Sequence, residues 1–165
     1  ELAPRGDSRA VDALLPRLEA ERDVMVREAV VGALGEVAER GDAAACAALQ
    51  RCLGPQGNGA AVREAAVLAI GKVAERGDRQ TVEALARCLD GDPDRSVKVG
   101  AAFVLGRVAL EEDVRAIEAL TYRFEDEDED RRVSAVAGQA LKRLGVDVDV
   151  EDFEETVDEK SCTIS

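Results

Sequence analysis

Residues 77–111 read GDRQTVEALARCLDGDPDRSVKVGAAFVLGRVALE and contain two apolar patterns on either side of Asp92-Pro93-Asp94. In the first pattern apolar residues recur at i, i+3 and i+7, which is one face of a short helix. The second pattern opens at Val97 and is rich in Ala and Gly, so a helix formed by it can lie close to a neighbour. The stretch therefore predicts a helix, a turn and a second helix.

The same phrase occurs four times along the chain. The units begin at Gly6, Gly41, Gly77 and Glu112. The apolar positions of the first helix correspond in every unit: Val11, Leu14, Leu18; Cys46, Leu49, Leu53; Val82, Leu85, Leu89; Ile117, Leu120, Phe124. The second helix opens each time at a corresponding valine: Val26, Val62, Val97, Val133. Self-similarity at this period predicts an all-α fold, a right-handed α-solenoid of stacked antiparallel helix pairs.

The repeat also predicts the domain boundaries. Four units are expected, at 6–40, 41–76, 77–111 and 112–145. Glu1-Leu2-Ala3-Pro4-Arg5 superimposes on Glu36-Val37-Ala38-Glu39-Arg40, so we expect residues 1–5 to end a preceding unit and the chain to be part of a longer array. Residues 146–165 break the repeat and form an acidic tail.

The turn motif resembles that of a known family. Asp92-Pro93-Asp94 with Val97-Lys98, and its relative Asp23-Val24-Met25-Val26-Arg27-Glu28-Ala29, are similar to HEAT repeats, particularly the short repeats of the phycobilisome lyases. The resemblance covers about residues 1–145. Tetratricopeptide and ankyrin arrays have a similar period, but their Trp, Tyr and Thr-Pro-Leu-His markers are missing here.

The resemblance implies a ladder in which a turn aspartate pairs with the cation that opens the second helix. It carries over to Asp23 with Arg27 and to Asp94 with Lys98. Two rungs are expected to be broken. Unit two keeps Arg63 but has Gly59 in place of the acid, and unit four keeps Asp130 but has Ser134 in place of the cation.

The family places the second helices on the concave side, where a partner would bind. Their positions away from the core predict a groove with an apolar centre and a cationic rim: Leu68, Lys72, Val99, Phe103, Arg107, Gln139 and Arg143. An apolar strip edged by charge is typical of a docking surface. The alternative is that Leu68 and Phe103 pack between neighbouring helices.

Composition limits the classes of function. The formal net charge of −13 disfavours nucleic acid and anionic lipid as partners. The chain has no His, and its four Cys form no CxxC pair, so we expect no catalytic, metal or cofactor residues. Cys52 and Cys88 are expected to border the outer surface without being activated. A reducing compartment is predicted, either the cytoplasm or an organelle stroma.

Three functions remain open at this point. The first is a non-catalytic protein-binding scaffold, the second a bilin lyase suggested by the resemblance alone, and the third a structural subunit of a large complex. The acidic run at residues 125–130 lacks the spaced ligands of a calcium loop, so a solvated turn is expected.

The tail offers two further hypotheses. Cys162-Thr163-Ile164-Ser165 matches a prenylation signal, and peripheral membrane association is expected only if Cys162 is lipidated. No stretch approaches the 18 or so apolar residues of a membrane span. The tail carries eight acidic residues against one lysine, so it could bind a partner or fold back onto the rim of Lys72, Arg107 and Arg143.

Overall fold

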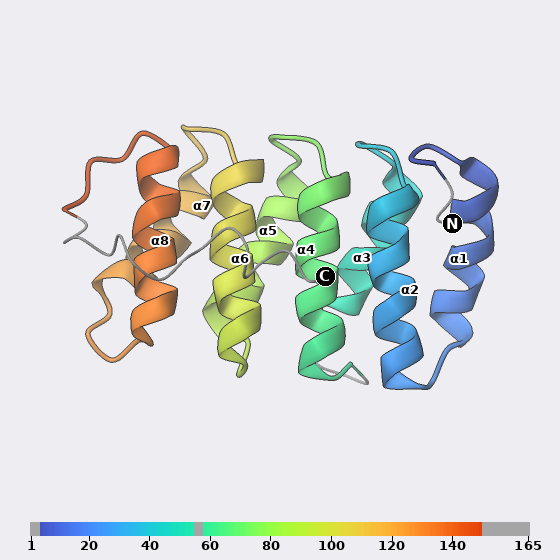
Figure 1. Ribbon diagram of the computed structural model, residues 1–165. Helices are drawn as coiled ribbons and strands as arrows, with labels where there is room; N and C mark the ends of the chain where they lie inside the picture. Colours follow the sequence, from blue (N-terminus) through green and yellow to red (C-terminus); the bar gives the residue numbers. More distant parts are fainter. Residues whose placement is uncertain (1–3, 55–57, 150–165) are drawn as a thin grey trace.

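The computed structural model describes residues 4–54 and 58–149. Within them it contains eight α-helices and no strand, in the order α1 Ser8–Ala20, α2 Val24–Val37, α3 Ala43–Cys52, α4 Ala60–Val73, α5 Arg79–Gly91, α6 Arg95–Val108, α7 Val114–Glu125 and α8 Arg131–Arg143 (Figure 1). The all-α prediction is confirmed. The predictions for residues 150–165, including Cys162, concern residues outside the described ones.

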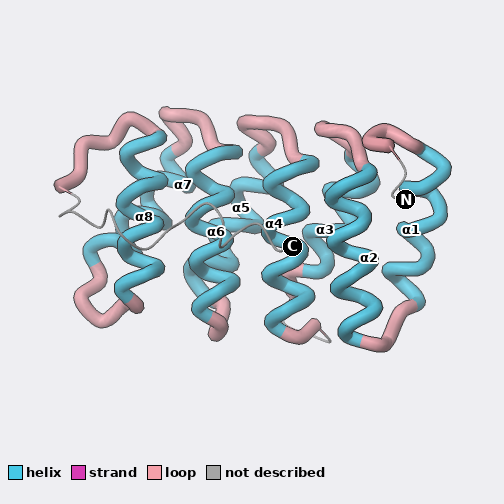
Figure 2. Tube along the Cα trace, in the orientation of Figure 1, coloured by secondary structure: helices cyan, strands magenta, loops and turns pink. Residues whose placement is uncertain are grey.

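The helices form two parallel rows. Helices α2, α4, α6 and α8 stand side by side in one row, α3, α5 and α7 stand behind them, and α1 lies beside α2 at the end of the array (Figure 1). The loops lie along the two edges of the array (Figure 2). Each helix pair packs against the next, so the described chain is an α-solenoid; its handedness and the domain boundaries stay predictions.

Aspartate begins seven of the eight described helices. Its carboxylate accepts hydrogen bonds from backbone N–H groups of the first turn, as Asp23 does from Val26 and Asp42 does from Ala45. Such caps stabilise a helix by about 1 kcal/mol each. Helix α4 is the exception among them, because Gly59 has no side chain to cap it.

The turn that enters a unit folds back onto the end of the second helix of that unit. Gly6, Gly41 and Gly77 have φ values of 88°, 86° and 84°, a conformation that residues with a Cβ rarely adopt. Their N–H groups donate 2.7 Å hydrogen bonds to the last-turn carbonyls of Val37, Val73 and Val108. The repeated Gly is therefore required by the backbone. Glu112 replaces it in the fourth unit, where no residue has a positive φ at this turn.

Glycine also sets the spacing between helices of the front row. A Cβ added to Gly35 of α2 would lie 2.7 Å from the Cβ of Ala69 in α4, and one on Gly106 of α6 would lie 2.7 Å from the Cβ of Ala140 in α8. These helices therefore approach almost backbone to backbone. The close approach makes α2, α4, α6 and α8 a continuous face.

The ion-pair ladder exists, but its predicted partners are wrong. Arg63 pairs with Asp92 at 2.7 Å, and Lys98 pairs with Glu129 at 2.9 Å. In both rungs the cation of one unit reaches the turn of the next unit. Asp23 and Asp94 cap their helices instead, because a carboxylate at the N-cap lies closest to free N–H groups of its own helix.

Two further predictions are corrected. The rung of unit two is not broken, since Arg63 finds Asp92 across the unit boundary. The acidic turn is not fully solvated: the Glu129 side chain is only 7% exposed and also accepts a hydrogen bond from Arg123. Lys98 and Arg123 offset the cost of burying the Glu129 carboxylate.

The cysteines lie deeper than predicted. Cys52 and Cys88 are 1% and 8% exposed, so they are core residues and do not border the outer surface. The periodicity put them on the flank of the first helix, but both belong to the hydrophobic core. In unit two, Asn58 donates a hydrogen bond to the Cys52 carbonyl.

Candidate functional site

The predicted partner-binding residues all lie on helices of the front row. Leu68 and Lys72 are on α4, Val99, Phe103 and Arg107 on α6, and Gln139 and Arg143 on α8. The four uncharged side chains are half-buried, whereas Lys72, Arg107 and Arg143 are exposed. Val99 and Phe103 pack against the hydrophobic core, so the apolar strip is partly sunk between neighbouring helices.

Phe103 is the point at which the predicted residues meet. The guanidinium carbons of Arg107, one turn further along α6, and of Arg143, on α8, both lie 5.4 Å from the centroid of its ring. Cations at this distance are attracted by the ring quadrupole. The ring is thus packed at its base and carries two cations at the surface. It therefore packs between helices and also contributes to the exposed face, the two alternatives given for it above.

Lys72 does not belong to this cluster. Its ammonium group forms an ion pair with Glu36 of α2. Among the residues that the structure describes, no acid pairs with Arg107 or Arg143. The available positive charge of the face is therefore smaller than predicted and is concentrated on the two arginines beside Phe103.

Helices α2 and α4 add two acids to the face, Glu28 and Glu64, which were not among the predicted binding residues. Glu64 of α4 has a raised pKa, caused by burial and then by the negative charges of Asp94 and Glu28. These acids lie at the N-terminal ends of their helices, whereas the arginines lie near the C-terminal ends. The sequence signal for this acidic charge is that Glu28 and Glu64 occupy the same position of the second helix in units one and two. The face therefore carries acids toward the N-terminal ends of α2 and α4, and arginines without an ion pair at the C-terminal ends of α6 and α8.

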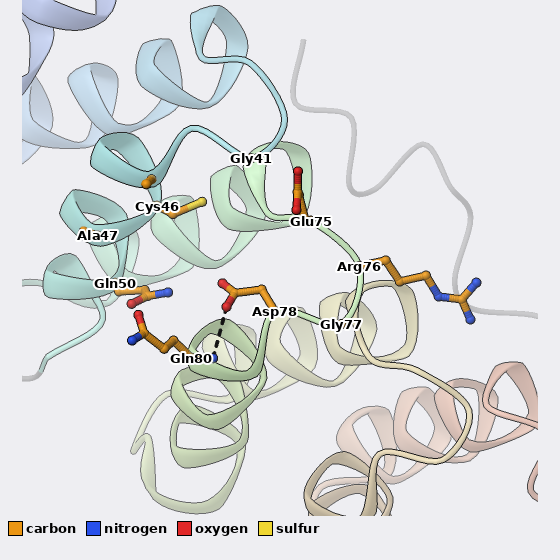
Figure 3. A pocket seen from close by; sticks show the side chains of 10 residues that line it. Gly41, Cys46, Ala47, Gln50, Glu75, Arg76, Gly77, Asp78 and Gln80 are labelled. Atoms are coloured by element: carbon orange, nitrogen blue, oxygen red, sulfur yellow. Dashed lines mark hydrogen bonds between the residues drawn. The ribbon is translucent and has the colours of Figure 1, made fainter.

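A shallow cleft lies elsewhere, between α3 and the turn that enters α5. It has a volume of about 350 Å³, and Cys46, Gln50, Glu75 and Asp78 line it (Figure 3). Burial, followed by the charges of Asp78, Asp42 and Glu75, raises the pKa of Cys46 to about 11. The thiol stays protonated at neutral pH and is a poor nucleophile.

The other described thiols are similarly inert. Burial, with a contribution from Asp92, raises the pKa of Cys88 to about 11, and burial raises that of Cys52. Within residues 4–54 and 58–149, no group of three or more His, Cys, Asp or Glu is placed to hold a metal ion. None of the described helices combines the length and the apolar character needed to cross a membrane.

The repeat pattern matches a known family. The sequence model described as HEAT repeats matches residues 56–142, more than half of the 165 residues. The chain belongs to the HEAT-repeat family. A search of curated proteins gave no significant match. HEAT repeats commonly mediate protein–protein interactions and are typically non-enzymatic, whereas the likeness of this HEAT-repeat chain to phycobilisome lyases stays a prediction.

Proposed function

We propose that the chain is a non-catalytic scaffold that binds a partner protein through the face formed by α4, α6 and α8. The observation that carries the proposal is the cluster of Phe103, Arg107 and Arg143. Aromatic and arginine side chains dominate the binding energy of protein interfaces. Because packing and ring contacts already hold this cluster, binding costs less side-chain entropy than it would for free side chains.

The polarity of the face indicates the chemistry of the partner. Acids of the partner would lie toward Arg107 and Arg143, and bases toward Glu28 and Glu64, with an apolar group over Phe103. Complementary charge of this kind selects the orientation of a partner and speeds its association. Val99 and Leu68 extend the apolar centre between the two ends.

Co-purification followed by mass spectrometry tests the proposal. The wild-type chain is expected to retain a protein that is lost from a Phe103→Ala variant. Tyr122→Ala is the matched control, because Tyr122 is an exposed aromatic residue of the rear helix α7 and also lies under an arginine, Arg123, at 4.4 Å. Retention of the same proteins by Phe103→Ala, with its helical circular dichroism intact, would overturn the proposal.

Co-purification also addresses the assembly alternative, and a separate titration with bilin addresses the lyase. A subunit of a large assembly would retain several proteins in fixed proportion. A bilin lyase would shift the visible absorption of added bilin. The cleft beside Cys46 does not favour the lyase, because Glu75 and Asp78 on its walls would repel the propionates of a tetrapyrrole. A reducing compartment stays part of our proposal, and the unpaired Cys46, Cys52 and Cys88 support it.

A further inference from the structure

Two neighbouring arginines of the front face, Arg107 and Arg143, are available to bind an anion. Arg107 and Arg143 both lie over the ring of Phe103, and among the described residues neither forms an ion pair. Half-buried Arg115 of α7, by contrast, pairs with both Glu83 and Asp90. Arg107 and Arg143 thus present two guanidinium groups without an ion pair over one aromatic ring.

The stacked arrangement suits carboxylates. A guanidinium group that lies against a ring keeps its N–H groups in its own plane, free to donate in pairs to a carboxylate. Arg107 and Arg143 come from neighbouring helices, so their separation is fixed by the packing of α6 on α8, in which Gly106 meets Ala140. The pair therefore suits a peptide segment that bears several closely spaced acids.

We propose that this arginine pair binds the acidic C-terminal segment of the chain itself, residues 151–165. The sequence of this segment, EDFEETVDEKSCTIS, contains six acids and one lysine. An untethered acidic peptide would be repelled by the negative charge of the whole chain. The C-terminal segment meets the same repulsion, but a short tether gives it an effective concentration in the millimolar range.

The described chain brings the tether to the correct place. Arg143 lies in the last turn of α8, and the backbone N–H of Val146 donates a 3.0 Å hydrogen bond to the carbonyl of Leu141. Val146 and Val148 then pack against the core, which keeps the chain against the array as far as Val148. Each further residue spans up to about 3.3 Å, and packed helices are about 8–10 Å apart. Residues 151–165 are therefore long enough to reach both arginines.

The contact would place the segment on the residues proposed for the partner. It is nevertheless independent of the proposed function, because both halves of the contact belong to this chain. Bound there, the segment competes with any partner for Arg107 and Arg143. A partner would then need to displace it.

A spin label on Cys162 tests the contact in the full chain. Cys46, Cys52 and Cys88 are buried, so a thiol-specific nitroxide is directed to Cys162. We expect the label to broaden the amide NMR signals at the C-terminal ends of α6 and α8. Neutralising both arginines, as Arg107→Gln with Arg143→Gln, should lower the docked fraction by about two- to fivefold for each arginine.

Two controls make the outcome decisive. Arg79→Gln with Arg87→Gln removes the same charge from the rear helix α5 and should leave the broadening unchanged. Amides in place of Glu151, Asp152, Glu154 and Glu155 should remove the broadening while both arginines are intact. Absence of broadening in the wild type, or equal broadening in the double arginine variant, would overturn the proposal. If the wild type shows no broadening, added poly-glutamate tells what the site binds. A shift of the Arg107 and Arg143 signals would then assign the site to an acidic partner and not to the C-terminal segment.

Discussion

Arg63 and Asp92 form a bidentate ion pair between α4 and the turn that enters α6. The Nε and Nη2 atoms of Arg63 donate to the two carboxylate oxygens at 2.7 and 2.8 Å, and the side chains are 7% and 5% exposed. Nη1 donates to the Asn58 carbonyl at 2.8 Å, and Asp92 also accepts from the N–H of Asp94. The pair is thus well satisfied by hydrogen bonds although it lies inside the array.

The first prediction concerns this rung. Asp92→Ala should lower the free energy of unfolding by about 3–5 kcal/mol, because it leaves the buried Arg63 charge without its partner. Glu36→Ala removes the exposed partner of Lys72 and should cost less than about 1 kcal/mol. Urea unfolding of both variants checks this. Equal losses would mean that the buried rung does not hold units two and three together.

The second prediction uses two glycines of α2. Gly35→Ala should destabilise the chain by about 1–3 kcal/mol, because the new Cβ meets both Cα and Cβ of Ala69 at under 3 Å. Gly32→Ala has no atom within 4 Å and should stabilise the same helix by about 0.5–1 kcal/mol. Thermal unfolding should give shifts of opposite sign, and shifts of the same sign would contradict the close packing of α2 on α4.

The third prediction concerns pH. Burial alone would raise the pKa of Glu129, but hydrogen bonds from Arg123 and Lys98 outweigh it, so the folded pKa lies below the usual value of 4.5. The unfolded state therefore binds the proton more tightly, and the stability contributed by Glu129 is lost as pH falls below about 4.5. Between about pH 7 and pH 4, the wild type should lose more stability than Glu129→Gln. Parallel losses in urea titrations would show that Glu129 is not stabilised by its cations.

The fourth prediction concerns thiol reactivity. With a pKa of about 11, Cys46 and Cys88 are thiolate in about one molecule per thousand at pH 8, and both are also shielded from reagents. In a Cys162→Ser variant, alkylation at pH 8 should be slow in buffer and complete in denaturant. Fast alkylation of the native protein, located by peptide mass spectrometry, would show that a first helix opens readily.

The fold could be predicted from the sequence because each unit encodes its own helices. Apolar spacing placed the buried residues Leu49, Leu85 and Leu120 correctly, all of which are 0% exposed. Spacing along one helix also put Phe103 and Arg107 on one face, since residues four apart are neighbours.

Contacts between units could not be predicted in the same way. The partner of Arg63 is Asp92, which lies two residues before Asp94, the turn acid of unit three that was expected to form a rung. The rotation of one unit on the next decides which acid faces the cation. The neutralisation of Lys72 by Glu36 likewise depends on how α2 packs on α4. These relationships follow from stacking geometry, which the periodicity of a single unit does not contain.

The most direct test of the proposed interface is a binding isotherm for a co-purified partner with the wild-type chain and with Phe103→Ala. We expect the substitution to weaken binding by about 2 kcal/mol, roughly 30-fold in Kd, because it removes the ring that orders Arg107 and Arg143. Tyr122→Ala should bind as the wild type does. An unchanged Kd for a folded Phe103→Ala protein would contradict the claim that this face holds the partner.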